Sequence, residues 1–235
     1  MTAFVLDPLH LGFYVLTWVT LWLFYRLTGR RTWVLVGGIA WLALSGWLAA
    51  RGIFRETDAL PPRLAFLLLP MLFGGLYLGF AGGAADFRSR IHPEGLHYLH
   101  TLRIAVELIF LKGFADRGEV ATVLTYEGNN YDVAMGILLP LTGWLVFRLR
   151  VLGRGWSAAA NVLGIVVLTG TVALAVLSSP SPLQQLEFEQ PTVAILELPL
   201  VWLPALVAPL MFWAHFLVLG RYWDDSRGAG RNQSI

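Results

Sequence analysis

The sequence has 235 residues, of which 57% are hydrophobic and only 14% charged, and its mean hydropathy is +0.64. This composition excludes an ordinary soluble globular domain. Because the chain contains no cysteine, disulfides, thiolate nucleophiles and cysteine-ligated metals are excluded as well. The net charge of +2 does not indicate nucleic acid, since the basic residues flank apolar stretches, where membrane orientation accounts for them.

Seven apolar stretches approach the length of about 20 residues that a helix needs to cross the hydrocarbon core of a bilayer. The sequence therefore predicts an all-α, polytopic transmembrane bundle of seven helices. It forms a single domain over residues 1–223, followed by a disordered tail over residues 224–235. The stretches are His10–Thr28, Trp33–Ala50, Leu64–Gly82, Leu96–Ala115, Asp132–Arg148, Ser157–Ser178 and Val193–Gly220.

The distribution of basic residues predicts the orientation of the chain. With seven crossings and an external N-terminus, eleven Lys and Arg residues fall in the inner connections and the tail, and five in the outer connections. This bias follows the positive-inside rule. If the fourth stretch lay on the membrane surface, the basic loop Arg148–Arg154 would lie outside, against that rule. We therefore expect a cytoplasmic C-terminus, the lipid bilayer as a partner, and a location in the inner (plasma) membrane.

Two patterns concern helix packing. Gly75, Gly79 and Gly83 recur at intervals of four in the third stretch, which favours a close helix–helix contact over a space for a flat ligand. Pro199, Pro204 and Pro209 recur every five residues in the last stretch, so a bent helix is expected there.

The fourth stretch carries ionisable residues that are costly in a bilayer and indicate a functional site. His97, His100, Arg103 and Glu107 fall within about a third of the helix circumference at ~100° per residue. The spacing of Arg103 and Glu107 lets the two side chains pair with each other. His215 and Glu197 in the seventh stretch and Asn161 in the sixth are placed to reach this stripe.

A polar loop, Thr125–Asp132, leads into the fifth stretch. Gly128 provides the positive φ with which this loop folds back as a lid over the outer ends of the fourth and seventh helices. The carboxylates of the loop then approach the pocket around Arg103 and Glu107. The expected ligand-binding residues are His100, Arg103, Glu107, Glu127, Asn130, Asp132, Glu197 and His215.

The segment His100–Glu107, the loop Thr125–Asp132 and a later proline-containing span with His215 together resemble a group of uncharacterised bacterial multi-pass membrane proteins. In that group the loop reads Thr-x-Glu-Gly-Arg-Asn-aromatic-Asp. Asn129 stands where those proteins carry the arginine, so a contact made by that charge is not expected here. The resemblance covers roughly residues 97–220 and implies no particular activity.

Three classes of function remain open from the sequence. The first is a membrane-embedded pocket that binds, senses or transports a small anionic or amphiphilic ligand. The second is an intramembrane enzyme in which His97, His100 and His215 hold a metal with Glu107 as general base, or a b-type haem protein ligated by His100 and His215. The third is a structural subunit of a larger membrane complex, in which the polar stripe joins helices.

Overall fold

The structure is a computed structural model that describes residues 7–232. Every regular element in this range is helical, so the all-α prediction is confirmed. The 3-10 segments are η1 (Ile53–Arg55), η2 (Gly82–Ala84), η4 (Thr122–Leu124) and η6 (Ala194–Leu196). The long helices are α1 (Pro8–Leu27), α2 (Thr32–Ala50), α3 (Ala65–Phe80), α8 (Asp132–Gly143), α9 (Arg154–Ser178) and α10 (Ala208–Asn232).

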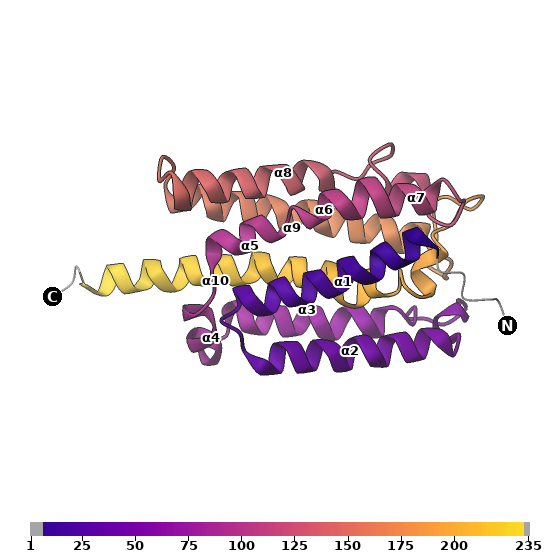
Figure 1. Cartoon of the computed structure of the whole chain (residues 1–235), viewed down its shortest axis with the longest axis horizontal. Coiled ribbons are helices and arrows are strands. Elements are labelled where there is room, and N and C mark those ends of the chain that lie inside the picture. The colour runs from indigo at the N-terminus through magenta and orange to yellow at the C-terminus, as the bar shows by residue number, and fades with distance from the viewer. Residues whose placement is uncertain (1–6, 233–235) are drawn as a thin grey trace.

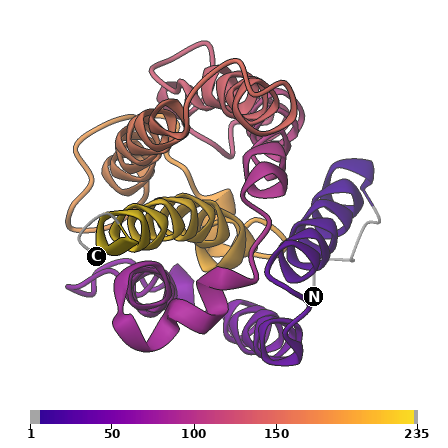
Figure 2. The ribbon, with the colours of Figure 1, turned by 90° about the vertical axis from the view of Figure 1, so that its left-hand side faces the viewer.

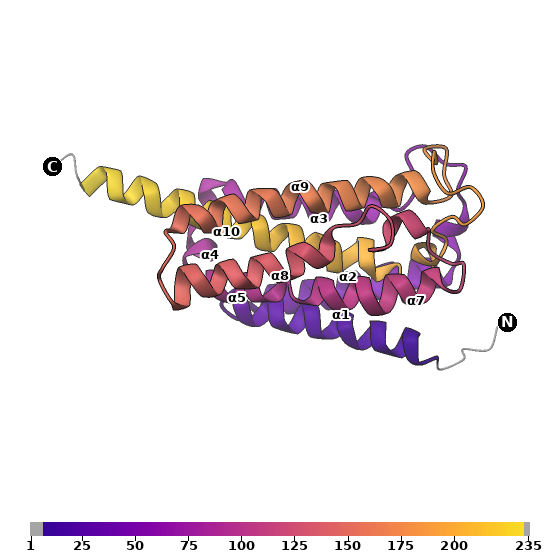
Figure 3. The same cartoon turned by 90° about the horizontal axis from the view of Figure 1, so that it is seen from above.

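The helices run nearly parallel to one long axis, and α10 occupies the centre of the bundle (Figures 1 and 2). We call the end that carries Asp7 and the loops 119–131 and 179–193 the loop end. The opposite end carries His92, Arg154 and Asp225, and we call it the tail end. Figure 3 shows that α1 begins at the loop end and that α10 projects beyond the other helices at the tail end.

Among residues 7–232, four helices are long and apolar enough to cross a membrane, or five if the bent pair of α3 with Gly82–Ser89 is one span. Large apolar side chains are exposed along these helices, among them Trp22, Phe73 and Val166. Such extensive apolar surface is not tolerated on a monomeric soluble protein. The chain has the features of a multi-pass membrane protein.

The fourth predicted span is a series of short segments rather than one regular helix. It comprises α5 (Pro93–Leu99), α6 (Leu102–Ala105), the π-helix η3 (Val106–Leu111) and α7 (Lys112–Ala115). A π-helix is rare and is frequently found at functional sites. The irregular backbone here coincides with the polar residues of the stripe.

The last predicted span differs from the expected bent helix over Val193–Gly220. Residues 197–202 are irregular, and the helix begins with the π-helix η7 (Leu203–Val207), which continues as α10. Pro204 stands at the first turn of this helix, where a proline lacks only an amide hydrogen that would have no partner. Pro204 therefore fits the start of the helix, whereas Pro209 lies within it.

The tail also differs from the expectation of disorder, because α10 continues to Asn232; residues 233–235 lie outside the described residues. Two ion pairs explain the ordered part of this extension. Asp224 accepts a hydrogen bond from Arg88 at 2.8 Å, and Asp225 accepts one from Arg154 at 2.5 Å. Both carboxylates tie the helix to the tail end of the bundle.

The glycine face of α3 packs on α10, as its spacing favours. A Cβ atom on Gly75 would lie 2.3 Å from the ring of Trp213, and one on Gly79 would lie 2.7 Å from the Cβ of Phe216. The aromatic side chains of the central helix therefore occupy the space that the glycines leave. Close approach of two helices accounts for this stripe without a ligand.

Helix α1 begins where Asp7 caps it. The Asp7 carboxylate accepts a hydrogen bond from the Leu9 amide at 3.2 Å and contacts the His10 ring nitrogen at 2.9 Å. It also pairs with Arg117, which follows α7. The side chain of Asp7 thus joins the start of the first helix to the end of the fourth predicted span.

We expect the contribution of Asp7 to stability to be lost in acid. Arg117, and then His10 and the Leu9 amide, hold the pKa of the Asp7 carboxyl below its usual range. A carboxyl with a lowered pKa in the folded state stabilises the fold above its unfolded value of ~3.9, and this contribution disappears as the pH falls through the lower folded value. Thermal melting of the wild type and Asp7→Asn should differ at pH 7 and converge towards pH 2. A difference independent of pH would contradict this role.

Candidate functional site

Arg103 and Asp132 form an ion pair inside the bundle, between α6 and the first residue of α8. Both residues are buried. The guanidinium Nη2 donates to Asp132 Oδ1, whereas no ion pair between Arg103 and Glu107 is present. The expected pairing of Arg103 with Glu107 is therefore wrong. Asp132 is the stronger partner because its carboxylate faces the guanidinium across the helix contact.

Asn130 connects this ion pair to Glu107. Its amide nitrogen donates to Glu107 Oε2 at 2.5 Å and to the carbonyl oxygen of Leu124 at 2.9 Å. Its amide oxygen accepts from the Asp132 backbone at 3.0 Å, and the Thr171 hydroxyl lies 3.0 Å from both Asn130 Oδ1 and Asp132 Oδ1. The amide thus uses both donors and its acceptor, and it fixes the two carboxylates relative to each other.

The loop that positions Asn130 depends on a glycine, though not through a positive φ. The Gly128 amide donates to the Thr125 carbonyl at 2.9 Å, and the Asn129 amide donates to the Val123 carbonyl at 3.1 Å. A Cβ atom on Gly128 would lie 2.5 Å from Val123 Cα. Glycine is required at this position because two backbone segments touch.

A second polar group lies closer to the tail end. The rings of His100 and His215 are stacked with their centroids 4.2 Å apart. His215 Nδ1 lies 2.9 Å from Asn161 Oδ1, and Asn161 Nδ2 lies 3.0 Å from His97 Nε2. His97 Nε2 also lies 3.0 Å from the Ser157 hydroxyl. One network of buried side chains therefore joins α5, α9 and α10.

Four buried side chains of the two groups retain polar atoms without a protein partner. In the described part of the chain these are both ring nitrogens of His100, Nε and Nη1 of Arg103, Oε1 of Glu107 and Nε2 of His215. Buried polar atoms normally have a partner, and each exception needs an explanation such as water or a ligand. The unpartnered atoms mark the region between the two groups as a site for further polar contacts.

Two of the eight expected ligand-binding residues lie away from this site. Glu197 is 51% exposed at the loop end, where it pairs with Arg55 at 2.8 Å rather than lying in the low-dielectric interior. Glu127 is 49% exposed and lies 3.6 Å from the Lys112 ammonium. Both carboxylates have basic partners outside the two buried groups, so Glu127 does not turn inward with Asn130 and Asp132. The other expected residues gather in the two buried groups.

The expected set lacks Ser157 and Thr171, and it also leaves out Asn161, although the sequence places that residue near the stripe. All three lie on the inward face of α9. A signal for them exists in the sequence, because the spacing of Ser157, Asn161, Gly164, Leu168 and Thr171 in steps of three and four residues defines one helix face. A largely apolar helix thus carries Ser157, Asn161 and Thr171 on one stripe, while Thr169 lies on its exposed face.

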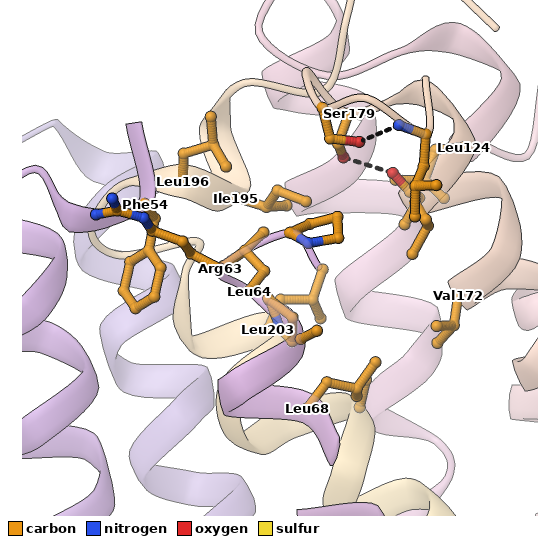
Figure 4. Close-up of a pocket in the computed structure, with 18 of the residues that line it drawn as sticks. Phe54, Arg63, Leu64, Leu68, Leu124, Val172, Ser179, Ile195, Leu196 and Leu203 are labelled. Atoms are coloured by element: carbon orange, nitrogen blue, oxygen red, sulfur yellow. Dashed lines mark hydrogen bonds between the residues drawn. The ribbon is translucent and has the colours of Figure 1, made fainter. Parts of the chain in front are cut away.

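A cleft of about 350 Å³ lies at the loop end between α3 and α9 (Figure 4). Its walls are largely apolar and include Leu64, Leu68 and Val172, while Ile195 and Leu203 border it on the side of η6 and η7. Both α3 and α9 pack against α10. The volume falls in the range of small-molecule sites, about 300–1,000 Å³.

The cleft reaches the buried ion pair. Asp132 and Thr171 belong to its lining, together with Val106 from η3. Arg63 and Glu56, which also line the cleft, pair with each other and so neutralise their charges. A molecule in the cleft would meet apolar side chains along most of its length, with Asp132 and Thr171 among the few polar residues.

The histidine geometry fits neither of the cofactor alternatives. A bis-histidine haem lies between its two ligands, whereas the stacked rings of His100 and His215 leave no room for a macrocycle. Within residues 7–232, no three His, Asp or Glu side chains converge in a way that could hold a metal ion. Comparison with known proteins found no matching family model, curated protein or solved structure.

Proposed function

We propose that the chain is an inner-membrane protein that crosses the bilayer seven times and binds an amphiphilic molecule in the cleft between α3 and α9. The loop end faces outside and the tail end faces the cytoplasm. The apolar part of the ligand lies along Leu68 and Val172, and its polar group lies near Asp132 and Thr171. The proposal rests on one observation above the others, the continuity of the apolar cleft with the buried polar cluster.

Ion pairs at the two ends support the seven crossings. At the loop end, Asp7 pairs with Arg117 and Arg55 pairs with Glu197, which joins segments that the charge pattern places outside. At the tail end, Arg31 pairs with Asp86 and Arg154 pairs with Asp225, which joins segments placed inside. Each of these pairs connects residues expected on the same side of the membrane, so the contacts agree with the orientation that the basic residues favour.

The charge of the cluster favours an amphiphile without a net negative charge. Arg103 is already neutralised by Asp132, and Glu107 adds a second acidic group to the cluster. An anionic head group beside Asp132 would meet a carboxylate rather than a guanidinium. A hydroxyl, an amine or a zwitterionic head group would instead find acceptors there. We therefore favour the amphiphilic ligand over the anionic one.

Blocking the cleft should abolish ligand binding. Val172→Trp fills the cleft from α9, whereas Val166→Trp places the same side chain at a 63% exposed position on the same helix. We expect native mass spectrometry of protein extracted from its membrane to show a lipid-sized adduct in the wild type and in Val166→Trp. The adduct should be absent from Val172→Trp.

The same measurement with added ligands tests the charge preference. Lysophosphatidylcholine should replace the endogenous adduct more readily than oleate does. A wild-type protein without any adduct, or equal retention by the two tryptophan variants, would contradict the proposal. If a second membrane protein remained bound while no lipid did, the structural-subunit interpretation would replace it.

A further inference from the structure

A second pocket, of about 650 Å³, opens at the tail end of the bundle. It is bounded by the start of α5, the start of α9 and the outer part of α10. Ser157 and Pro93 belong to its lining. This pocket lies at the opposite end from the amphiphile cleft, and its lining shares no residue with that cleft.

The hydroxyl of Ser157, which belongs to the lining, lies 3.0 Å from Nε2 of the buried His97 behind it. The other ring nitrogen, His97 Nδ1, lies 2.8 Å from the carbonyl oxygen of Pro93. A carbonyl oxygen only accepts hydrogen bonds, so Nδ1 carries the proton and Nε2 presents its lone pair to Ser157. The Pro93 carbonyl thereby fixes the tautomer that a general base needs.

The imidazole is held in this orientation on several sides. Asn161 donates one amide hydrogen to the Ser157 carbonyl at 2.8 Å, and its amide nitrogen lies 3.0 Å from His97 Nε2, so it shares the single lone pair of that nitrogen with the Ser157 hydroxyl. Phe147 contacts the ring edge-on with the centroids 5.5 Å apart, and a Cβ on Gly143 would lie 2.6 Å from the Cβ of His97. His97 therefore has Ser157 as its nucleophile, the Pro93 carbonyl as its orienting partner and packed neighbours around its ring. This is the arrangement expected of a base in a nucleophilic site.

Charged groups lie at the mouth of the same pocket. Arg154 and Arg221 belong to its lining, and each pairs with Asp225, which also lines it. Ser157 is the fourth residue of the 25-residue helix α9, and the amides of Arg154 and Gly155 just before it have no partner within the helix. Amides at a helix start and nearby guanidinium groups stabilise negative charge that develops on a carbonyl oxygen.

We propose that Ser157 and His97 form a nucleophile–base pair that cleaves carboxylic esters entering from the tail end. His97 Nε2 takes the hydroxyl proton as Ser157 Oγ attacks the ester carbonyl. The bond to the alcohol breaks, and the alcohol leaves with the proton from His97. Water then attacks the acyl-serine, gives its proton to His97 and releases the carboxylic acid, which restores Ser157.

The lining indicates an amphiphilic ester. Leu27, Ile91 and Val218 give the pocket an apolar side, and Glu94, Arg154 and Asp225 give it a charged side. An ester with one apolar and one polar substituent matches both sides. Peptide bonds flanked by charged side chains would leave the apolar side without a partner.

A fluorophosphonate probe tests the nucleophile directly. Attack by Ser157 Oγ forms an oxygen–phosphorus bond, fluoride leaves, and the hydroxyl proton passes to His97. We expect the full-length protein in detergent to be labelled, and peptide mass spectrometry to place the label on Ser157. Ser157→Ala should lose at least nine-tenths of the labelling, and His97→Gln should slow it at least tenfold.

Ser178→Ala is the matched control, because Ser178 is a buried serine at the other end of α9 whose hydroxyl contacts Thr192 at 2.9 Å. It should label as the wild type does. Hydrolysis of p-nitrophenyl dodecanoate should follow the same order among the variants. Since the modified residue is mapped in the wild type, the result does not depend on the folding of any variant. Absence of labelling above a heat-denatured sample, or a label on another residue, would overturn the proposal.

Discussion

Arg103→Met should destabilise the protein by about 3–5 kcal/mol, the largest effect expected from a single substitution in the buried cluster. The variant leaves the Asp132 carboxylate inside the bundle without its positive partner. Replacing both charges should cost less than replacing Arg103 alone, because Asp132→Asn removes the stranded charge and keeps a side-chain oxygen for Thr171. The measurement is thermal or denaturant unfolding in detergent.

A comparison of two double-mutant cycles identifies the partner of Arg103. The coupling energy between Arg103→Met and Asp132→Asn should exceed that between Arg103→Met and Glu107→Gln, because only Asp132 contacts the guanidinium. Arg55→Met, which breaks the exposed pair with Glu197, is the matched control and should leave the stability nearly unchanged. Equal coupling to both carboxylates would mean that Arg103 is shared between them.

Gly164→Ala should destabilise the protein by about 1–3 kcal/mol, the usual cost of overpacking. A Cβ atom at this position would lie 2.2 Å from Cε1 of His215 and 2.7 Å from its Nε2. The ring would have to leave its stack with His100 and its contact with Asn161. Because the histidine is fully buried, it has no alternative position in solvent.

The control for this prediction lies on the same helix. A Cβ atom on Gly170 would meet no packed neighbour within 4 Å, so Gly170→Ala should be neutral or stabilise α9 by about 0.5–1 kcal/mol. Unfolding of both variants in one detergent separates the packing effect from helix propensity. Similar stability of the two variants would show that His215 moves aside at little cost. The buried network around His215 would then not be rigid.

Composition and periodicity were sufficient to predict the helical class and the inward position of the stripe, because burial of His100, Arg103 and Glu107 follows from the cost of exposing them to lipid. Their partners were harder to predict. A spacing of four residues favours a pair within one helix, whereas Arg103 binds a carboxylate that is distant in sequence. Contacts across helices depend on how the segments pack, which hydrophobic spacing alone does not determine.

The exposed carboxylates illustrate the same limit. Glu197 lies in an apolar sequence context, which predicts burial, but the residues before η7 are irregular and place it beside Arg55 at the loop end. Pro199, Pro204 and Pro209 predict kinks in a helix over this span. In the structure the helix begins only at Leu203, after Pro199. The cleft is equally absent from the sequence pattern, since its walls come from segments more than 100 residues apart.

The most direct test of the account is the side of the membrane that each end of the bundle faces. Because the chain has no cysteine, single variants report cleanly, and Glu189→Cys at the loop end and Ser226→Cys at the tail end are both exposed positions. A membrane-impermeant maleimide applied to right-side-out vesicles should label Glu189→Cys only, and inverted vesicles should reverse the result. Labelling of both positions from the same side would mean that η7 and α10 do not cross the membrane, and the reversed pattern would contradict seven crossings with the cleft facing outward.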